Sequence, residues 1–443
     1  MRWKLNLSPS RVLVLGFAGV IFAGSLLLSI PQATAAGKTT PYIDALFTAT
    51  SAVCVTGLVV VETGRHWSIL GQLVTIVLIQ VGGLGIMTMS TLFALIIGKR
   101  ISLRERLLIQ EAAGLSRMAG VVRLVKAILQ VTLVAEGAGA LLLTARFARD
   151  MPLAKAAYFG VYHSVSAFCN AGFDLFGTSF MGYVGDWTVN LVVTSLIIVG
   201  GIGFTVIVEL WETRLGRRGR LSLHSRTALK VTAWLLCAGT VLMYLFERYN
   251  PATLAPLPPH ARLLAAYFHA VTPRTAGFNT IATGKMTLPA LVVTMVLMFI
   301  GASPGGTGGG IKTTTFATVV SMVGSILRGK QDVEMGDKRL ARDVVDRALA
   351  IAALSLGLLV VVTVLLSATQ KALLVGMMFE ATSAFGTVGL SMGITPTLTT
   401  GGKLFIMMTM FAGRVGPLTL AMAIAQRAHV APVRLPEDRL LVG

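Results

Sequence analysis

The stretch Ser51-Ala52-Val53-Cys54-Val55-Thr56-Gly57-Leu58 follows a short apolar segment and ends in a small polar loop that closes with a glycine. The same pattern returns three more times along the chain. The four loops, called the repeat loops below, are residues 52–57, 167–172, 272–277 and 384–389. Their final glycines lie 115, 105 and 112 positions apart (172−57, 277−172 and 389−277). Such a long period, with hydrophobic segments on both sides of each loop, predicts four copies of one membrane unit.

Four copies around an axis would place four short stretches of backbone carbonyl around one passage, which is how channels replace the water shell of a cation. A half-helix that enters from outside also aims the negative end of its dipole at the membrane centre. Irregular backbone at that depth is tolerated where it lines water or is buried in protein. A single glycine could merely end a helix. Four in register favour a central, cation-binding pore.

The composition predicts a membrane protein. The chain has 443 residues, of which 54% are hydrophobic and 13% charged, whereas about a quarter of the residues in soluble domains are charged. Several apolar runs reach the ~20 residues needed to cross a bilayer, and the first is 12–30. This run resembles a signal peptide, with Ala33-Thr34-Ala35 as a passable cleavage site. The recurrence of the same pattern without such a site favours a retained span.

The basic residues behind the net charge of +19 are unevenly placed along the chain. Basic residues cluster before the first span and in alternate connections, at residues 99–126, 214–230 and 328–347. The positive-inside rule assigns these connections to the cytoplasm, and they could also attract anionic membrane lipid. Nucleic-acid binding is not expected. The three cysteines, Cys54, Cys169 and Cys237, show no spacing typical of a disulfide framework or a zinc site.

Each unit is expected to contain an outward span, a half-helix, a repeat loop and a returning span. The outward spans are 12–30, 121–144, 228–246 and 348–368, and the half-helices are 41–53, 154–168, 261–271 and 373–383. The returning spans are 69–97, 187–210, 287–327 and 404–425, and the units are 1–105, 106–220, 221–335 and 336–443. The fold class predicted is an all-α membrane protein with eight full spans and four re-entrant half-helices in a pseudo-fourfold arrangement around a central pore. Both termini would be cytoplasmic.

The repeat loops, the phrase from Ser51 to Leu58 and a glycine-rich break in the third unit resemble the TrkH/TrkG/KtrB/HKT superfamily of potassium transporters. The resemblance covers essentially the whole chain. TrkH-type members carry two additional spans at the N-terminus, so a chain that starts with the first unit resembles the KtrB branch, the membrane subunits of bacterial Ktr systems. The resemblance implies a selectivity filter made of Val55, Thr56, Gly57, Asn170, Ala171, Gly172, Thr275, Ala276, Gly277, Thr387, Val388 and Gly389. Because Gly57 is not replaced by serine, as it is in sodium-preferring plant relatives, potassium is the expected ion.

The break itself, called the glycine-rich loop below, runs from Gly301 to Lys312 and holds six glycines, a proline, a serine and a threonine. These residues cannot continue a helix. A phosphate-binding loop is excluded by one inserted residue and by the absence of a preceding strand, and a plain connection between two short helices is the simpler alternative. We expect an intramembrane loop below the filter. The resemblance implies that it is the gate, with the residues Ala302, Ser303, Pro304, Gly305, Gly306, Thr307, Gly308, Gly309, Gly310 and Lys312.

Arg414 is a lone charge within the last returning span. A charge near mid-span costs about 2.5–3.5 kcal/mol on insertion scales, so it needs a compensating environment. Snorkelling is the simpler alternative. We expect Arg414 to face the pore as a positive barrier, and a matching arginine occupies this position in the family. Glu136 and Glu209 receive no role.

Function classes other than transport find little support. No GxSxG, HExxH or paired Cys/His arrangement is present, so an enzyme is not expected. The main rival is a secondary cation symporter for K⁺ and Na⁺ with alternating access, a class that often uses inverted repeats and broken helices. The four units here have parallel topology, which favours a ring of loops.

The expected function is therefore channel-like potassium uptake across the bacterial cytoplasmic membrane. The resemblance further implies a homodimer docked to a cytosolic, KtrA-like nucleotide-binding ring that controls the gate, often with sodium dependence. No cofactor is expected in this chain, because the nucleotide would bind the partner.

Overall fold

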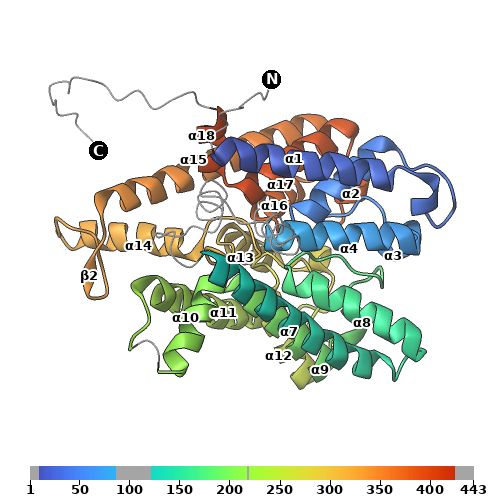
Figure 1. Cartoon of the computed structure of the whole chain (residues 1–443), viewed down its shortest axis with the longest axis horizontal. Coiled ribbons are helices and arrows are strands. Elements are labelled where there is room, and N and C mark those ends of the chain that lie inside the picture. The colour runs from blue at the N-terminus through green and yellow to red at the C-terminus, as the bar shows by residue number, and fades with distance from the viewer. Residues whose placement is uncertain (1–8, 86–120, 217–218, 425–443) are drawn as a thin grey trace.

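The structure is a computed structural model that describes residues 9–85, 121–216 and 219–424. Within these ranges the chain is almost entirely helical, which confirms the predicted all-α class. Two short strands, β1 (Glu334–Met335) and β2 (Lys338–Arg339), form a hairpin at one end of the molecule, beyond α14 and α15 (Figure 1). The remaining short elements are α3 (Thr63–His66), η1 (Pro31–Ala33), η2 (Met181–Tyr183), η3 (Thr283–Lys285) and η4 (Thr395–Thr397).

Four long helices are the outward legs of the four predicted units. They are α1 (Pro9–Leu28), α7 (Val121–Phe147), α11 (Leu223–Glu247) and α15 (Arg342–Thr369). In the described ranges these are the continuous helices that are long and apolar enough to cross a membrane. Large apolar side chains such as Leu133 and Val360 are exposed on them. Exposed apolar surface on a helix of this length is typical of a multi-pass membrane protein that faces lipid.

Each outward leg packs against a half-helix, as the sequence predicts. The half-helices are α2 (Tyr42–Val53), α8 (Leu153–Phe168), α12 (Pro259–Val271) and α16 (Leu374–Gly386). They hold 12, 16, 13 and 13 residues, so none is long enough to cross a bilayer alone. A proline stands at the N-cap of α2, α8 and α12, where its fixed φ suits the start of a helix.

The returning legs differ from the prediction of uninterrupted spans. They are α4 (Ile69–Leu84), the pair α9 (Trp187–Gly201) and α10 (Phe204–Arg214), the pair α13 (Leu288–Phe299) and α14 (Thr313–Leu327), and the pair α17 (Thr400–Val415) and α18 (Pro417–Ile424). Only the break in the third unit was expected. The second leg bends by 96° between α9 and α10. The predicted end of the first returning span lies outside the described residues.

Three of these breaks have the same cause. Gly85, Gly203 and Gly416 have φ values of 84°, 98° and 93° with extended ψ, and they stand at the end of α4, before α10 and at the end of α17. A right-handed helix cannot pass through a residue with positive φ, and glycine adopts it at little cost. The returning legs of the first, second and fourth units therefore break at corresponding glycines, and the third breaks at the glycine-rich loop.

The returning legs pack directly on the ends of the half-helices. A Cβ built on Gly82, Gly200 or Gly413 would lie 2.0, 1.9 and 1.9 Å from the carbonyl oxygen of Val53, Phe168 and Phe385 respectively. Small residues permit such close backbone contact between membrane helices. This close packing fixes the C-terminal ends of α2, α8 and α16, where their repeat loops begin.

Candidate functional site

The four repeat loops share one unusual backbone conformation. Their residues Val55, Asn170, Thr275 and Thr387 have φ values of 57°, 60°, 76° and 49°. Two positions later, Gly57, Gly172, Gly277 and Gly389 have φ values of 91°, 69°, 77° and 94°. Positive φ is uncommon outside glycine, above all for β-branched residues such as valine and threonine. Its recurrence at one position of every loop indicates a conformation that the site requires.

The structure brings the four final glycines together. Each lies against the backbone of the next loop, and the fourth lies against the first, so the loops contact one another in closed order. A Cβ on Gly57 would lie 2.4 Å from the Ala171 oxygen, on Gly172 2.7 Å from the Ala276 oxygen, on Gly277 2.4 Å from the Val388 oxygen, and on Gly389 2.2 Å from the Thr56 oxygen. No side chain can be added at any of these positions without displacing a neighbouring loop.

Hydroxyl groups of the half-helices support the loops. The hydroxyls of Ser51 and Ser383 accept hydrogen bonds from the amides of Gly57 and Gly389, both at 3.1 Å. In the other two units the hydroxyl donates to the carbonyl after the glycine, Ser166 to Phe173 at 2.8 Å and Thr272 to Phe278 at 2.6 Å. Sequence reasoning missed these residues. The signal was a serine or threonine six, six, five and six positions before each glycine (57−51, 172−166, 277−272 and 389−383).

Two buried hydroxyls within the loops have no hydrogen-bond partner. They belong to Thr56 and Thr387, and both side chains are fully buried. A buried polar atom without a partner is costly. No hydrogen bond within the described residues offsets the burial of these two oxygens.

A cavity of about 220 Å³ lies over the four glycines. Its wall includes all four of them, together with Asp174, Asn279 and Ser391. Asp174 is the one ionisable residue in this wall. Its carboxylate accepts hydrogen bonds from the amides of Gly177 and Ser179, at 2.7 and 3.1 Å. Burial raises the pKa of Asp174, and these hydrogen bonds oppose the rise by favouring the ionised form.

The glycine-rich loop is hydrogen-bonded to the backbone at the bend between α9 and α10. The amides of Ser303 and Thr307 donate to the oxygens of Gly201 and Gly200, at 2.9 and 3.0 Å. In return, the Phe204 amide donates to the Gly305 oxygen at 3.0 Å. The Thr307 hydroxyl also reaches the Phe168 oxygen, at 3.2 Å, at the end of α8. The loop is thus held as an ordered part of the second unit's returning leg.

The same loop lies against two repeat loops. A Cβ on Gly308 would lie 2.0 Å from the hydroxyl oxygen of Thr275, and one on Gly309 would lie 2.3 Å from that of Thr387. The glycine-rich loop therefore contacts Thr275 and Thr387, two positions before the final glycines of their repeat loops, whereas the 220 Å³ cavity contacts the glycines themselves.

Arg414 and Lys312 both donate hydrogen bonds to the glycine-rich loop. The Arg414 guanidinium donates to the carbonyl oxygens of Thr307 and Gly82, and also to that of Gly83, at 3.3 Å. The Lys312 ammonium donates to the Gly308 oxygen at 2.7 Å. Arg414 stands in the last turn of α17, before the break at Gly416, and not in the middle of a continuous helix as the sequence suggested. Its charge is compensated by backbone dipoles.

Two buried histidines near the repeat loops differ in their hydrogen bonding. His163 is hydrogen-bonded through Nδ1 to the Phe159 oxygen at 2.7 Å and through Nε2 to the Leu175 amide at 3.2 Å. Neither ring nitrogen of His269 has a partner. Glu136, to which no role was given, accepts from Gln80 at 3.1 Å behind the second repeat loop. No group of three or more His, Cys, Asp or Glu in the described ranges could hold a metal ion.

Comparisons with known proteins agree on one family. The family model TrkH, described as "Cation transport protein", matches residues 18–430. The chain is 41% identical to "Ktr system potassium uptake protein B" of Bacillus subtilis, over 100% of this chain and 98% of that protein. It is 42% identical to the protein of the same name from Vibrio alginolyticus, over 100% and 96%. It is 40% identical to "Potassium/sodium uptake protein NtpJ" of Enterococcus hirae, over 100% and 99%.

A solved structure has the same fold. The potassium transporter TrkH from Vibrio parahaemolyticus superposes with a TM-score of 0.76, at 20% identity, over 96% of this chain and 87% of that one. The match of the family model over most of the chain, and the full-length similarity to the relatives, lead to one conclusion: the chain belongs to the TrkH family of cation transport proteins.

Proposed function

We propose that this chain is the channel-like membrane subunit of a potassium uptake system in the bacterial cytoplasmic membrane. Four units, residues 1–105, 106–220, 221–335 and 336–443, would surround one pore in a pseudo-fourfold arrangement. The observation that carries the proposal is the closed order of the repeat loops, in which Gly389 lies against Thr56 as Gly57 lies against Ala171. Among the relatives, three carry potassium uptake in their names.

Ion selection would rest on the backbone of the repeat loops. Rings of carbonyl oxygens replace the water shell of potassium in channel filters, and four half-helices would aim their negative ends at the same place. The unpartnered hydroxyls of Thr56 and Thr387 would add ligands at the inner side. Asp174, at the wall of the outer cavity, would raise the local cation concentration.

The glycine-rich loop would be the gate. It lies against Thr275 and Thr387 and is fastened by Arg414 and Lys312. These contacts favour a closed state, and the two positive charges would oppose a cation beneath the filter. Opening would require the glycine-rich loop to move, which would break the contacts of Thr307 with Arg414, Gly200 and Phe168. The driving force for uptake would be the membrane potential, worth about 2.3 kcal/mol per charge per 100 mV.

A regulatory partner would supply the energy for opening. The proposed assembly is a homodimer docked to a cytosolic, KtrA-like nucleotide-binding ring. Two relatives are named as protein B of a Ktr system, which fits one membrane component of several subunits. Both termini and the hairpin β1–β2, which carries Lys338 and Arg339, would face the cytoplasm. No cofactor would bind in this chain.

A second candidate is a secondary symporter that couples potassium to sodium by alternating access. The name of the Enterococcus hirae relative, which includes both ions, favours it, and so do the broken returning helices. Sodium-coupled uptake would be abolished by collapse of the sodium gradient. Channel-like uptake would continue as long as the membrane potential remains.

The decisive experiment is rescue of a potassium-uptake-deficient bacterium at low external potassium, with and without a KtrA-like partner. The wild-type chain should restore growth, most strongly with the partner. Gly57→Ser should abolish or relax the preference for potassium, because its side chain would strike the second repeat loop. Gly376→Ala in α16 is the matched control, since a Cβ on Gly376 would lie 3.7 Å from its nearest neighbour, the Ile394 side chain. No rescue by a correctly inserted wild-type chain with its partner would refute the proposal.

A further inference from the structure

The third repeat loop contains a buried charge that the other three lack. Arg274 stands between Pro273 and Thr275, and the corresponding residues of the other loops are Cys54, Cys169 and Gly386. Arg274 is 6% exposed. Ionisable residues at membrane depth are costly, so they mark functional positions more often than structural ones.

The guanidinium of Arg274 reaches the beginning of the glycine-rich loop. Its Nη2 donates to the Gly301 oxygen at 3.3 Å, and its Nη1 donates to the Thr232 oxygen on α11 at 3.5 Å. Its Nε has no partner. Gly301 is the first residue after α13 and Ile300, where the third returning leg breaks. The side chain thus joins a repeat loop to the start of the glycine-rich loop.

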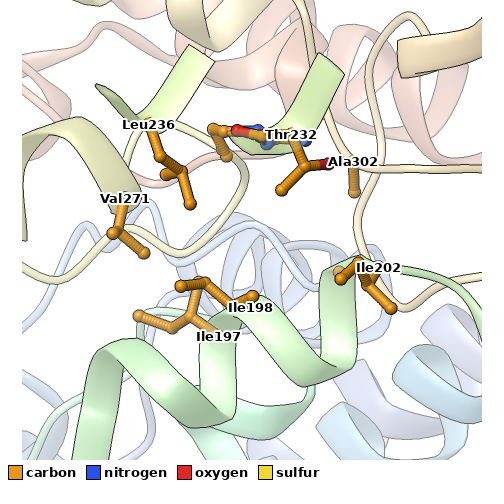
Figure 2. A pocket seen from close by; sticks show the side chains of 9 residues that line it. Ile197, Ile198, Ile202, Thr232, Leu236, Val271 and Ala302 are labelled. Carbon is orange, nitrogen blue, oxygen red and sulfur yellow. Dashed lines mark hydrogen bonds between the residues drawn. The ribbon is translucent and has the colours of Figure 1, made fainter. Parts of the chain in front are cut away.

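The surroundings of Arg274 leave little room for a bound ligand. Figure 2 shows the side chains around a cavity of about 10 Å³ that Arg274 lines, most of them apolar, among them Ile197, Leu236 and Val271. This volume is about that of one water molecule, so an anionic ligand does not fit. The Thr232 hydroxyl, like the Arg274 Nε, has no partner.

The next residue contacts a second part of the glycine-rich loop. A Cβ on Gly308 would lie 2.0 Å from the Thr275 hydroxyl oxygen. Two neighbouring residues of one repeat loop therefore contact the glycine-rich loop at two places, Arg274 at Gly301 and Thr275 at Gly308. A movement of the glycine-rich loop as a whole would break both contacts.

We propose that Arg274 is a positioning residue that couples the third repeat loop to the glycine-rich loop, so that ion selectivity and opening are linked. This inference rests on the proposed function. When the Arg274–Gly301 contact is present, the glycine-rich loop is held in place and Thr275 is fixed against it. When the contact is lost, the glycine-rich loop is released, and the third repeat loop changes conformation with it.

The test compares the full-length wild type with Arg274→Gln and Arg274→Lys, reconstituted in vesicles without the partner subunit. The measured quantities are the basal potassium flux and the ratio of potassium to sodium flux. A third measurement is independent of transport: the potassium concentration that gives half of the full rise in Tm in detergent, because ion binding stabilises the folded state. Thr232→Val is the matched control, since it lines the same cavity and keeps the backbone oxygen that Arg274 contacts.

Arg274→Gln should raise basal flux at least threefold, lower the potassium-to-sodium ratio at least fivefold and require at least threefold more potassium for half of the Tm rise. Arg274→Lys should give intermediate values, because a lysine cannot reproduce the fork of a guanidinium. Thr232→Val should behave as the wild type. A flux increase with an unchanged ratio overturns the coupling, and so does an equal effect of Thr232→Val.

If Arg274→Gln does not reach the membrane, Arg274→Lys decides alone, and a wild-type ratio in that variant overturns the inference. Failure of the underlying function is recognised separately. In that case the wild-type protein itself shows neither potassium flux nor a potassium-dependent Tm, and the coupling falls with it. A wild type that conducts, with an Arg274→Gln variant that keeps its selectivity, refutes only the coupling.

Discussion

Arg414 donates a hydrogen bond to the carbonyl oxygen of Thr307, although 107 positions separate the two residues. The same guanidinium donates to the oxygen of Gly82, 332 positions away. One side chain of the fourth unit thus fastens the glycine-rich loop of the third unit to the returning helix of the first. These contacts would let Arg414 restrain the glycine-rich loop, in addition to the electrostatic role proposed for its charge.

Replacing Arg414 by glutamine should increase potassium flux in the absence of a partner subunit. Hydrogen bonds to a charged group contribute about 1.5–3 kcal/mol each, so the loss of one such bond raises the open population about tenfold or more. The measurement is potassium or rubidium uptake into vesicles. Arg226→Gln, which removes only an exposed ion pair with Asp337, serves as the control. Equal flux in the Arg414 variant and the wild type would contradict the fastening role.

Deleting residues 305–309 should give a larger leak than the Arg414 variant. The deletion removes the Thr307 oxygen and the glycines that lie against Thr275 and Thr387. Uptake should become independent of the partner subunit. The check is growth and uptake with and without the partner, together with a folding test by size-exclusion chromatography. Unchanged flux through a folded deletion variant would count against the gate.

Replacing Gly389 by alanine should impair potassium transport far more than replacing Gly376, although both belong to the fourth unit. Gly389 has a φ of 94°, and its Cβ would lie 2.2 Å from the Thr56 oxygen. An L-residue in this region costs about 1–2 kcal/mol before any clash. We expect uptake below about a tenth of wild type for Gly389→Ala, since 1.4 kcal/mol alone corresponds to a factor of ten. Similar uptake by the two variants would show that the closed order is not needed.

The stability of the folded protein should depend on the protonation of His66 in α3. Its Nε2 is hydrogen-bonded to the Thr40 hydroxyl at 2.8 Å. Burial lowers the pKa of His66 below its ordinary value of 6.5, and the nearby Asp44 opposes this shift. The folded protein therefore binds fewer protons than the unfolded chain in the window from the folded pKa up to 6.5, so stability rises with pH across that window.

Two Tm measurements in detergent, at about pH 5.5 and about pH 7.5, check this expectation. The wild type should lose Tm at the lower pH, and His66→Gln should lose less. His260→Gln, at an exposed position, is the control. An identical pH dependence in wild type and His66→Gln would refute the assignment.

The sequence predicted the half-helices well because their boundaries are marked locally. Prolines at residues 41, 152 and 258 begin three of them, and a small polar loop with a glycine ends each. The four repeat loops were also recognised, because a glycine ends each of them in the sequence. The four positions with positive φ outside glycine were not foreseen, because valine, asparagine and threonine carry no such signal.

The returning legs show why the rest could not be predicted. Hydropathy records only how apolar a run is, and 187–210 and 404–425 are predominantly apolar, with Glu209 and Arg414 as their charged residues. The breaks at Gly203 and Gly416 depend on positive φ at single glycines, and glycine occurs in straight membrane helices as well. The place of Arg414 beside Thr307 depends on contacts between units, which no local pattern reports.

The mutual contact of the four final glycines has a consequence for how this fold tolerates change. Gly57, Gly172, Gly277 and Gly389 each contact the backbone of the next repeat loop, and the fourth loop contacts the first. A substitution that displaces one loop therefore disturbs the packing of its neighbours on both sides, and the four repeats tolerate sequence change only together.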